Sequence, residues 1–127
     1  MAKKVLIVDD AVHIRILLEQ TLEDLEDAGV ALLKAEDGVE GWEVIQAERP
    51  DLVLLDVMMP GLSGHEVCRR IRSDPDLSRT YVIILTARGQ EIDRRRSIEV
   101  GANEYITKPF DPNYLIHRAA DVLGVRI

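Results

Sequence analysis

The chain has little cysteine, no long apolar run and a shortage of positive charge. Cys68 is the only cysteine among the 127 residues, so no internal disulfide can form, and no base beside it suggests thiol chemistry. No apolar run approaches the roughly 20 residues needed to cross a bilayer. The net charge of -7 opposes the phosphate backbone of nucleic acids, and acidic residues flank the one basic run, at 94–96. These absences argue against membrane insertion and against direct binding of nucleic acid.

The composition and length indicate a single globular domain. The apolar share is 46% and the charged share 31%, and the sequence shows no internal repeat, low-complexity tract or linker. We therefore expect one domain over residues 1–127. The start, residues 1–9, carries two lysines, but its apolar run ends after four residues, which predicts a strand rather than a signal peptide. A cytoplasmic location follows as an expectation.

Residues 51–64 form the stretch around which the other motifs are arranged. The four apolar residues 52–55 are too few for a helix and do not alternate with polar residues, which predicts a strand buried on both faces. Asp56 then lies at the carboxyl end of that strand. The residues Met59, Pro60 and Gly61 indicate a turn, after which Ser63 or Gly64 can begin a helix.

Strands and helices are predicted to alternate along the rest of the chain. The apolar runs predict strands at 5–8, 30–33, 52–55, 81–85 and 104–107. Helical spacing predicts one helix after each strand: from Asp10 to near Gly29, then at about 39–48, 64–73, 90–100 and 111–123. Because right-handed crossovers leave few other arrangements, this order predicts an α/β fold, a doubly wound parallel sheet with helices on both faces.

The helix predicted at about 90–100 differs from the others in its apolar content. Its apolar residues are chiefly Ile92, Ile98 and Val100. A helix with few apolar side chains gains little from burial. We therefore expect this helix to be held loosely.

Charged and hydroxyl side chains follow four of the five predicted strands. Asp9 and Asp10 follow the first strand, Asp56 the third, Thr86 the fourth and Lys108 the fifth. Taken singly, each could be a helix cap, a turn residue, a strand end or a surface charge. Together they fall on the edge where ligands bind in such sheets. Three carboxylates there repel one another, so either a proton or a cation is held among them. Oxygen ligands suggest Mg²⁺, and an aspartate beside a metal, a lysine and a hydroxyl suits phosphoryl transfer.

Four motifs resemble those of the response regulator receiver domains of bacteria and archaea. They are IVDD at 7–10, LLDVMMPGLSG at 54–64, IILTA at 83–87 and GANEYITKPF at 101–110. The resemblance covers essentially the whole chain. It implies a flavodoxin-like (βα)5 three-layer sandwich with the strand order 2-1-3-4-5.

The resemblance also implies roles for the acidic residues. Asp56 would accept a phosphoryl group from a phosphohistidine on a sensor histidine kinase or a phosphotransfer protein. Asp10 and Asp56 would bind Mg²⁺ directly, Asp9 would assist, often through water, and the backbone carbonyl of Met58 would be a further ligand. Met58 and Arg88 would flank the path of the water that hydrolyses the phosphoryl group.

Further residues would hold the phosphoryl group and transmit its presence. By the same resemblance, Lys108 and Thr86 bind phosphoryl oxygens, together with the peptide nitrogens of Met58 and Ala87. Thr86 and Tyr105 would form the switch pair, in which Tyr105 turns inward as Thr86 moves. The bond between Lys108 and Pro109 is expected to be cis. The three histidines, His13, His65 and His117, fall on three different predicted helices, so a metal site is not expected and a structural role is preferred for each. Contact of His13, near Asp10, with the rim of the site is the less favoured alternative.

The function that follows is a phosphorylation-controlled switch that binds another protein rather than an enzyme acting on other substrates. It would catalyse only its own phosphotransfer and slow autodephosphorylation. Its output surface is predicted on the helix near 90–100, the strand 104–107 and the helix from 111. The partner there would be a downstream protein or a second copy in a phosphorylation-dependent homodimer. The charged residues Arg94, Arg95, Glu99 and Glu104 predict that this contact is sensitive to salt.

Three alternatives remain to be weighed. The sequence could be the receiver part of a longer regulator with an effector domain, although nothing after residue 123 resembles one. An aspartyl-phosphate hydrolase would need an aspartate at position 58, where this chain has methionine. A flavin-binding electron carrier would need a loop rich in Ser, Thr and Gly after the first strand, where Asp9 and Asp10 would repel the phosphate.

Overall fold

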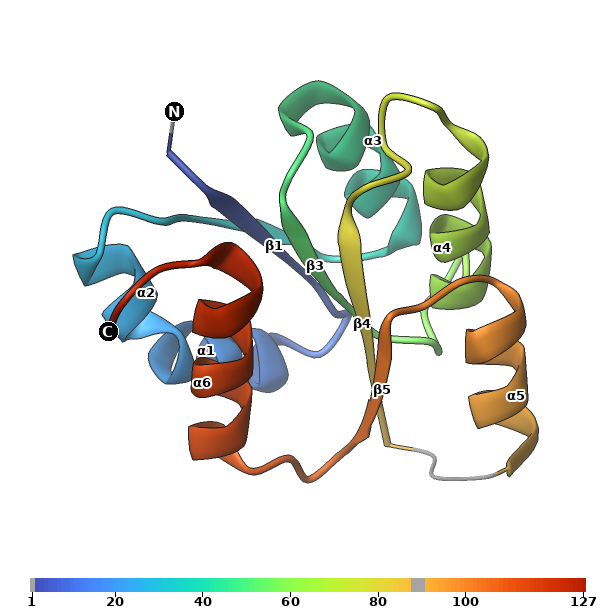
Figure 1. The fold of residues 1–127 in the computed structure, drawn as a ribbon. Helices are drawn as coiled ribbons and strands as arrows, with labels where there is room; N and C mark the ends of the chain where they lie inside the picture. The colour runs from blue at the N-terminus through green and yellow to red at the C-terminus, as the bar shows by residue number, and fades with distance from the viewer. Residues whose placement is uncertain (1, 88–90) are drawn as a thin grey trace.

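A parallel five-stranded sheet runs through the centre of the molecule (Figure 1). The computed structural model describes residues 2–87 and 91–127, with side chains described for all of these except 91–93. The strands are β1 (Lys4–Val8), β2 (Ala31–Ala35), β3 (Leu52–Leu55), β4 (Tyr81–Thr86) and β5 (Glu104–Thr107). They are ordered β2-β1-β3-β4-β5, which confirms the predicted fold and strand order.

The register of the strands determines which residues meet at the carboxyl edge. Val8 pairs with Leu55, so the chain leaves β1 and β3 at the same level of the sheet. Thr86 pairs with Thr107 on the neighbouring strand, and the backbone nitrogen of Lys108 donates to the Thr86 carbonyl at 2.7 Å. All four residues of β3 are buried, as the uninterrupted apolar run predicts.

Helices cover both faces of the sheet (Figure 1). On one face lie α1 (Val12–Thr21), α2 (Glu23–Asp27) and α6 (Pro112–Leu123), which share an apolar core with Val5, Ile7, Leu54 and Ile83. On the other lie α3 (Gly38–Glu48), α4 (Gly64–Ser73) and α5 (Glu91–Glu99). Alternate residues of each inner strand therefore point into two separate cores. Within the described ranges, none of the helices has the length and apolar character needed to span a membrane.

The region predicted as one helix from Asp10 to near Gly29 is divided into α1 and α2. Leu22 separates them, with φ -99° and ψ 10°, and both flanking segments remain helical. The hydroxyl of Thr21 donates to the carbonyl of Leu17 at 2.8 Å, a contact that commonly bends helices. Leu18, Leu22 and Leu25 nevertheless face one core, so the apolar spacing predicted the buried face but not the break.

A polar cluster joins α6 to the edge of the sheet. The carboxylate of Glu104 on β5 accepts hydrogen bonds from the Tyr81 and Tyr114 hydroxyls at 3.0 and 3.1 Å. Arg118 of α6 pairs with the same carboxylate at 2.8 Å and donates to the Tyr81 hydroxyl at 2.8 Å. This group, which we call the Glu104 cluster, links β4, β5 and α6 through charge-assisted hydrogen bonds.

Candidate functional site

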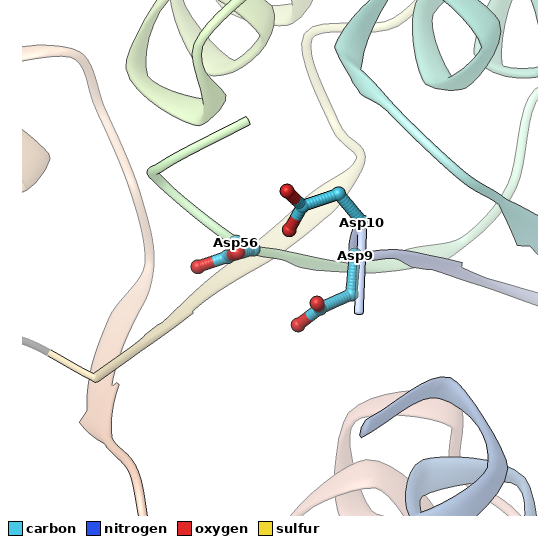
Figure 2. A group of neighbouring side chains, drawn as sticks. All are labelled: Asp9, Asp10 and Asp56. Atoms are coloured by element: carbon cyan, nitrogen blue, oxygen red, sulfur yellow. The ribbon is translucent and has the colours of Figure 1, made fainter. Parts of the chain in front are cut away.

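Three carboxylates converge at the carboxyl edge of the sheet (Figure 2). Asp9 and Asp10 follow β1, and Asp56 follows β3. One carboxylate oxygen from each lies within 4.8 Å of those of the other two. Asp9 is 2% exposed and Asp56 7% exposed, whereas Asp10 is open to solvent. The sequence prediction that these three side chains meet is confirmed.

Lys108 brings a positive charge to this acidic group. Its ammonium lies 2.7 Å from Asp9 Oδ2 and 3.6 Å from Asp56 Oδ1. The other oxygen of Asp9 accepts from the Ala11 nitrogen at 2.9 Å. Lys108 therefore pairs most closely with Asp9, while it also faces the carboxylate of Asp56.

Asp56 lies where a negative charge is costly. Burial raises its pKa to about 6, and the negative charges of Asp9 and, more weakly, Asp10 act in the same direction. The ammonium of Lys108 and a 2.9 Å hydrogen bond from the Val57 nitrogen lower the pKa in part. The carboxylate is thus incompletely compensated, so a cation bound here would stabilise its ionised form.

The start of α4 packs directly on the backbone of Asp56. The Gly64 nitrogen donates to the Val57 carbonyl at 3.0 Å, and a Cβ at Gly64 would lie 2.0 Å from the Asp56 carbonyl oxygen. Only glycine fits at that distance. Ser63, one of the two helix starts that the sequence left open, caps the helix by accepting from the Glu66 backbone nitrogen at 3.2 Å. Between them and Asp56 the loop exposes Met58, whose side chain is 57% accessible.

The remaining predicted residues lie around the same edge. Thr86 is buried at the end of β4, and Ala87 lines the hollow that contains Asp9, Asp56 and Lys108. The bond between Lys108 and Pro109 is cis, as predicted. Tyr105 on β5 is half-buried and packs against the core on the α3 and α4 side. Arg88, predicted beside the water path, lies outside the described residues.

The hollow beside the carboxylates has a volume of about 510 Å³. Its lining includes the charged residues Asp9, Asp10, Asp56 and Lys108 and the apolar residues Ile14, Leu17, Pro109 and Phe110. His13 also lines it, so the less favoured of the two alternatives for this residue is the one observed. A reactant with a small anionic group and an apolar flank would fit this hollow.

The donor set fits Mg²⁺. Carboxylate oxygens are hard ligands, and the exposure of Asp10 leaves room for the waters that Mg²⁺ retains. Among the described residues, the group gathered here contains only carboxylates and includes neither a cysteine sulfur nor a histidine nitrogen. The participation of the Met58 carbonyl remains a prediction.

His65 was not predicted to contribute more than packing. It is buried at the start of α4, and its Nε2 is hydrogen-bonded to Ser97 Oγ of α5 at 3.0 Å. The helical spacing of residues 65, 68 and 71 marks the buried face of α4. That spacing is the only sequence signal for His65, and it does not identify Ser97 as the partner.

The fold and the acidic edge define a class of protein. The chain matches the response regulator receiver domain family over residues 5–120 and belongs to that family. Receiver domains are the phosphorylation-activated switches of two-component response regulators.

Similar proteins include a transcriptional regulator and a chemotaxis protein. The phosphate regulon transcriptional regulatory protein PhoB of Pseudomonas aeruginosa is 44% identical over 123 residues, which cover 97% of this chain and 52% of PhoB. The chain spans about half the length of the curated relatives it matches. The chemotaxis protein CheY4 of Vibrio cholerae is 32% identical, with a TM-score of 0.83 over 96% of this chain and 99% of CheY4.

A third similar protein has a magnesium ion in its active-site cleft. It is the receiver domain of a sensor histidine kinase from Pseudomonas aeruginosa, 27% identical, with a TM-score of 0.84 over 98% of this chain and 99% of that domain.

Proposed function

We propose that Asp56 accepts a phosphoryl group from a phosphohistidine on a sensor histidine kinase or a phosphotransfer protein. The observation that carries this is the position of the Asp56 carboxylate, buried among Asp9 and Asp10 and 3.6 Å from the Lys108 ammonium. A carboxylate oxygen of Asp56 forms the new bond to phosphorus. The bond from phosphorus to the imidazole nitrogen breaks, and that nitrogen keeps the electron pair.

The residues around Asp56 have separate tasks in this reaction. Asp9, Asp10, Asp56 and the Met58 carbonyl would hold Mg²⁺, which neutralises charge on the transferred group when it is bound. Lys108 is near enough to move from Asp9 to a phosphoryl oxygen, since its ammonium already contacts both aspartates. Apolar side chains line part of the same hollow beside the reacting carboxylate.

Thr86 and the backbone nitrogens of Met58 and Ala87 would complete the phosphoryl site. The Thr86 hydroxyl would donate to a phosphoryl oxygen, which draws the end of β4 toward Asp56. Tyr105 lies on the neighbouring strand, where its partner across the sheet is Ile84, two residues before Thr86. A shift of Thr86 therefore leaves space that Tyr105 can fill, and these two residues form the proposed switch pair.

The output surface is proposed to comprise α5, β5 and α6. A downstream protein, or a second copy of this chain after phosphorylation, would dock there. Because the chain spans about half of PhoB and similar regulators, the same domain could equally serve as the receiver part of a longer regulator with an effector domain. We place the protein in the cytoplasm, where histidine kinases present their phosphohistidine.

The activity is self-directed. The chain would catalyse its own phosphorylation and slow loss of the phosphoryl group rather than turnover of an external substrate. Met58 supports this proposal because its side chain has no group that could act as the general acid of an aspartyl-phosphate hydrolase.

Acetyl phosphate with Mg²⁺ tests the phosphoryl acceptor. The intact mass of the protein is expected to rise by one phosphate, and Asp56→Asn is expected to remove this increase. Asp51→Asn, at the opposite end of β3, is the matched control and is expected to be labelled like the wild type. Labelling of Asp56→Asn to the wild-type level would show that another residue is the nucleophile.

A further inference from the structure

The described side chains of α5 make little apolar contact with the rest of the molecule. Among the described side chains of α5, those at 94–99, only Ser97 is buried, while Ile98 is 66% exposed. Ile92, expected as an apolar anchor, lies outside the described side chains. Hydrogen bonds from α4 therefore help to hold this part of the chain, beside the packing of Val100 and Ala102 against the core.

Three residues on one face of α4 make these hydrogen bonds. His65 Nε2 bonds Ser97 Oγ at 3.0 Å, Cys68 Sγ donates to the Val100 carbonyl at 3.4 Å, and Arg72 Nε donates to the Gly101 carbonyl at 2.8 Å. Positions 65, 68 and 72 follow each other by three and four residues, so they form one row along α4. The row meets Ser97, in the last turn of α5, at one end and residues 100 and 101, which directly follow α5, at the other.

The carboxyl end of α5 is fixed by contacts that do not depend on the phosphorylation site. Besides Gly101, the Arg72 guanidinium binds the carbonyls of Ser78 and Thr80 and the side chain of Asn103, at 2.6 to 3.2 Å. Asn103 in turn exchanges hydrogen bonds with the backbone of Val82. This end of α5 is thus bound to two loops and to the start of β4, far from the carboxyl edge of the sheet.

Ser97, in the last turn of α5, is in contrast bonded to a residue that follows the phosphorylation loop. His65 comes directly after Gly64, whose nitrogen binds the Val57 carbonyl and whose Cα lies against the carbonyl of Asp56. His65 also lines a hollow of about 470 Å³ together with Asp10, Met58 and Arg96. A displacement of the loop after Asp56 is therefore carried to His65 through rigid backbone contacts.

We propose that His65 is a positioning residue that links the phosphorylation loop to α5. The His65 and Ser97 hydrogen bond holds α5 in the arrangement seen here. Phosphorylation displaces the loop and breaks the bond, and α5 then turns about the fixed residues 100–103 that follow it. This inference rests on the proposed function, since it needs a phosphoryl group on Asp56 as the signal. A hydrogen bond of this kind changes the ratio of two states by about fivefold.

Amide hydrogen exchange of α5 tests the link in the unphosphorylated protein. Ser97→Ala removes the hydroxyl with little change of volume, and exchange of the amides at 95–99 is expected to become about fivefold faster. The amides at 101–103 are expected to keep their rates, because Arg72 still holds that end. Ser73→Ala is the matched control: its hydroxyl donates to the Arg69 carbonyl within α4, and α5 is expected to exchange as in the wild type.

A second variant tests the pair rather than one residue. His65→Phe keeps a ring in the same space without the hydrogen bond, and it should accelerate exchange at 95–99 like Ser97→Ala. The double variant should exchange no more than about twofold faster than either single variant, because both remove the same interaction. Fully additive effects, or wild-type exchange in Ser97→Ala, would overturn the proposal.

Beryllofluoride with Mg²⁺, as an analogue of the phosphoryl group, shows whether the His65 and Ser97 bond responds to phosphorylation or only stabilises the fold. Under saturation the wild type is expected to exchange at 95–99 within about twofold of Ser97→Ala, since its bond is already broken. A fivefold difference that persists under saturation would show that the bond only supports the fold. The mass assay with acetyl phosphate distinguishes the two proposals: a wild type that takes up no phosphoryl group overturns the proposed function, whereas labelled variants without an exchange difference overturn only the role of His65.

Discussion

Replacing Asp56 by asparagine is expected to stabilise the protein at neutral pH. Burial, and then the charge of Asp9, raises the pKa of this carboxyl from 3.8 to about 6, so its ionisation is resisted by the folded state. At about 1.4 kcal/mol per pKa unit, ionisation costs the folded state at most about 3 kcal/mol. Asparagine keeps the oxygen that accepts from Val57 but removes an ion partner from Lys108. We therefore expect a net gain in the free energy of unfolding of roughly 1–2 kcal/mol.

The pH dependence of this gain has a definite sign. Because the folded-state pKa is higher than the unfolded-state pKa, the favourable contribution of Asp56 is complete below 3.8 and is lost as the pH rises through about 6. The difference between Asp56→Asn and the wild type should therefore be small at about pH 4 and reach its full size by about pH 8. Mg²⁺ is expected to narrow the difference, because it binds the folded wild type and stabilises it.

Denaturant unfolding of both proteins across this pH range, in the presence of a chelator, measures the effect. Asp27→Asn, on the exposed surface of α2, is the matched control and should change the free energy of unfolding by less than about 0.5 kcal/mol throughout. A difference for Asp56→Asn that is equal at low and high pH would refute the argument. A wild type more stable than the variant at about pH 8 would refute it as well.

Three further results are expected. Asp10→Asn should weaken Mg²⁺ binding by roughly tenfold or more in calorimetry, and equal affinities would remove Asp10 from the metal site. Met58→Asn should shorten the lifetime of the phosphorylated protein, because an amide can orient water and a thioether cannot, and an unchanged or slower decay of the phosphorylated mass would contradict this. Gly64→Ala should lower the free energy of unfolding by about 1–3 kcal/mol, since its Cβ would lie 2.0 Å from the Asp56 carbonyl, and unaltered stability would contradict that close approach.

The sequence predicts the sheet and the meeting of the acidic residues because both depend on local patterns. Uninterrupted apolar runs mark the buried parallel strands, and the alternation of strands and helices places every strand end at the same edge. Asp9, Asp10 and Asp56 are therefore expected at one edge, and the strand order that the family resemblance implies makes their two strands, β1 and β3, neighbours. Their roles in phosphoryl transfer, and that of Thr86, remain predictions.

Other features depend on distances that no local pattern contains. The sequence did not show which aspartate Lys108 would pair with. Its ammonium lies closer to Asp9 than to Asp56, and differences of about one ångström decide which ion pair forms. The contact of Lys108 with a phosphoryl group stays a prediction. The break at Leu22 lies within one apolar pattern. The partner of His65 is 32 residues away, and helical spacing shows that a residue is buried without showing what it meets.

The Glu104 cluster gives the proposed output surface two halves with different mechanics. One carboxylate holds two tyrosines and Arg118 together, so β5 and α6 should move as a single body. The other half, α5, is attached to α4 and can change its angle to that body. A partner that contacts both halves would then bind only when α5 has a particular angle to the body formed by β5 and α6. Because the charge of Glu104 is already used within the chain, added salt should weaken such a partner's contacts on the α5 half more than those on the α6 half.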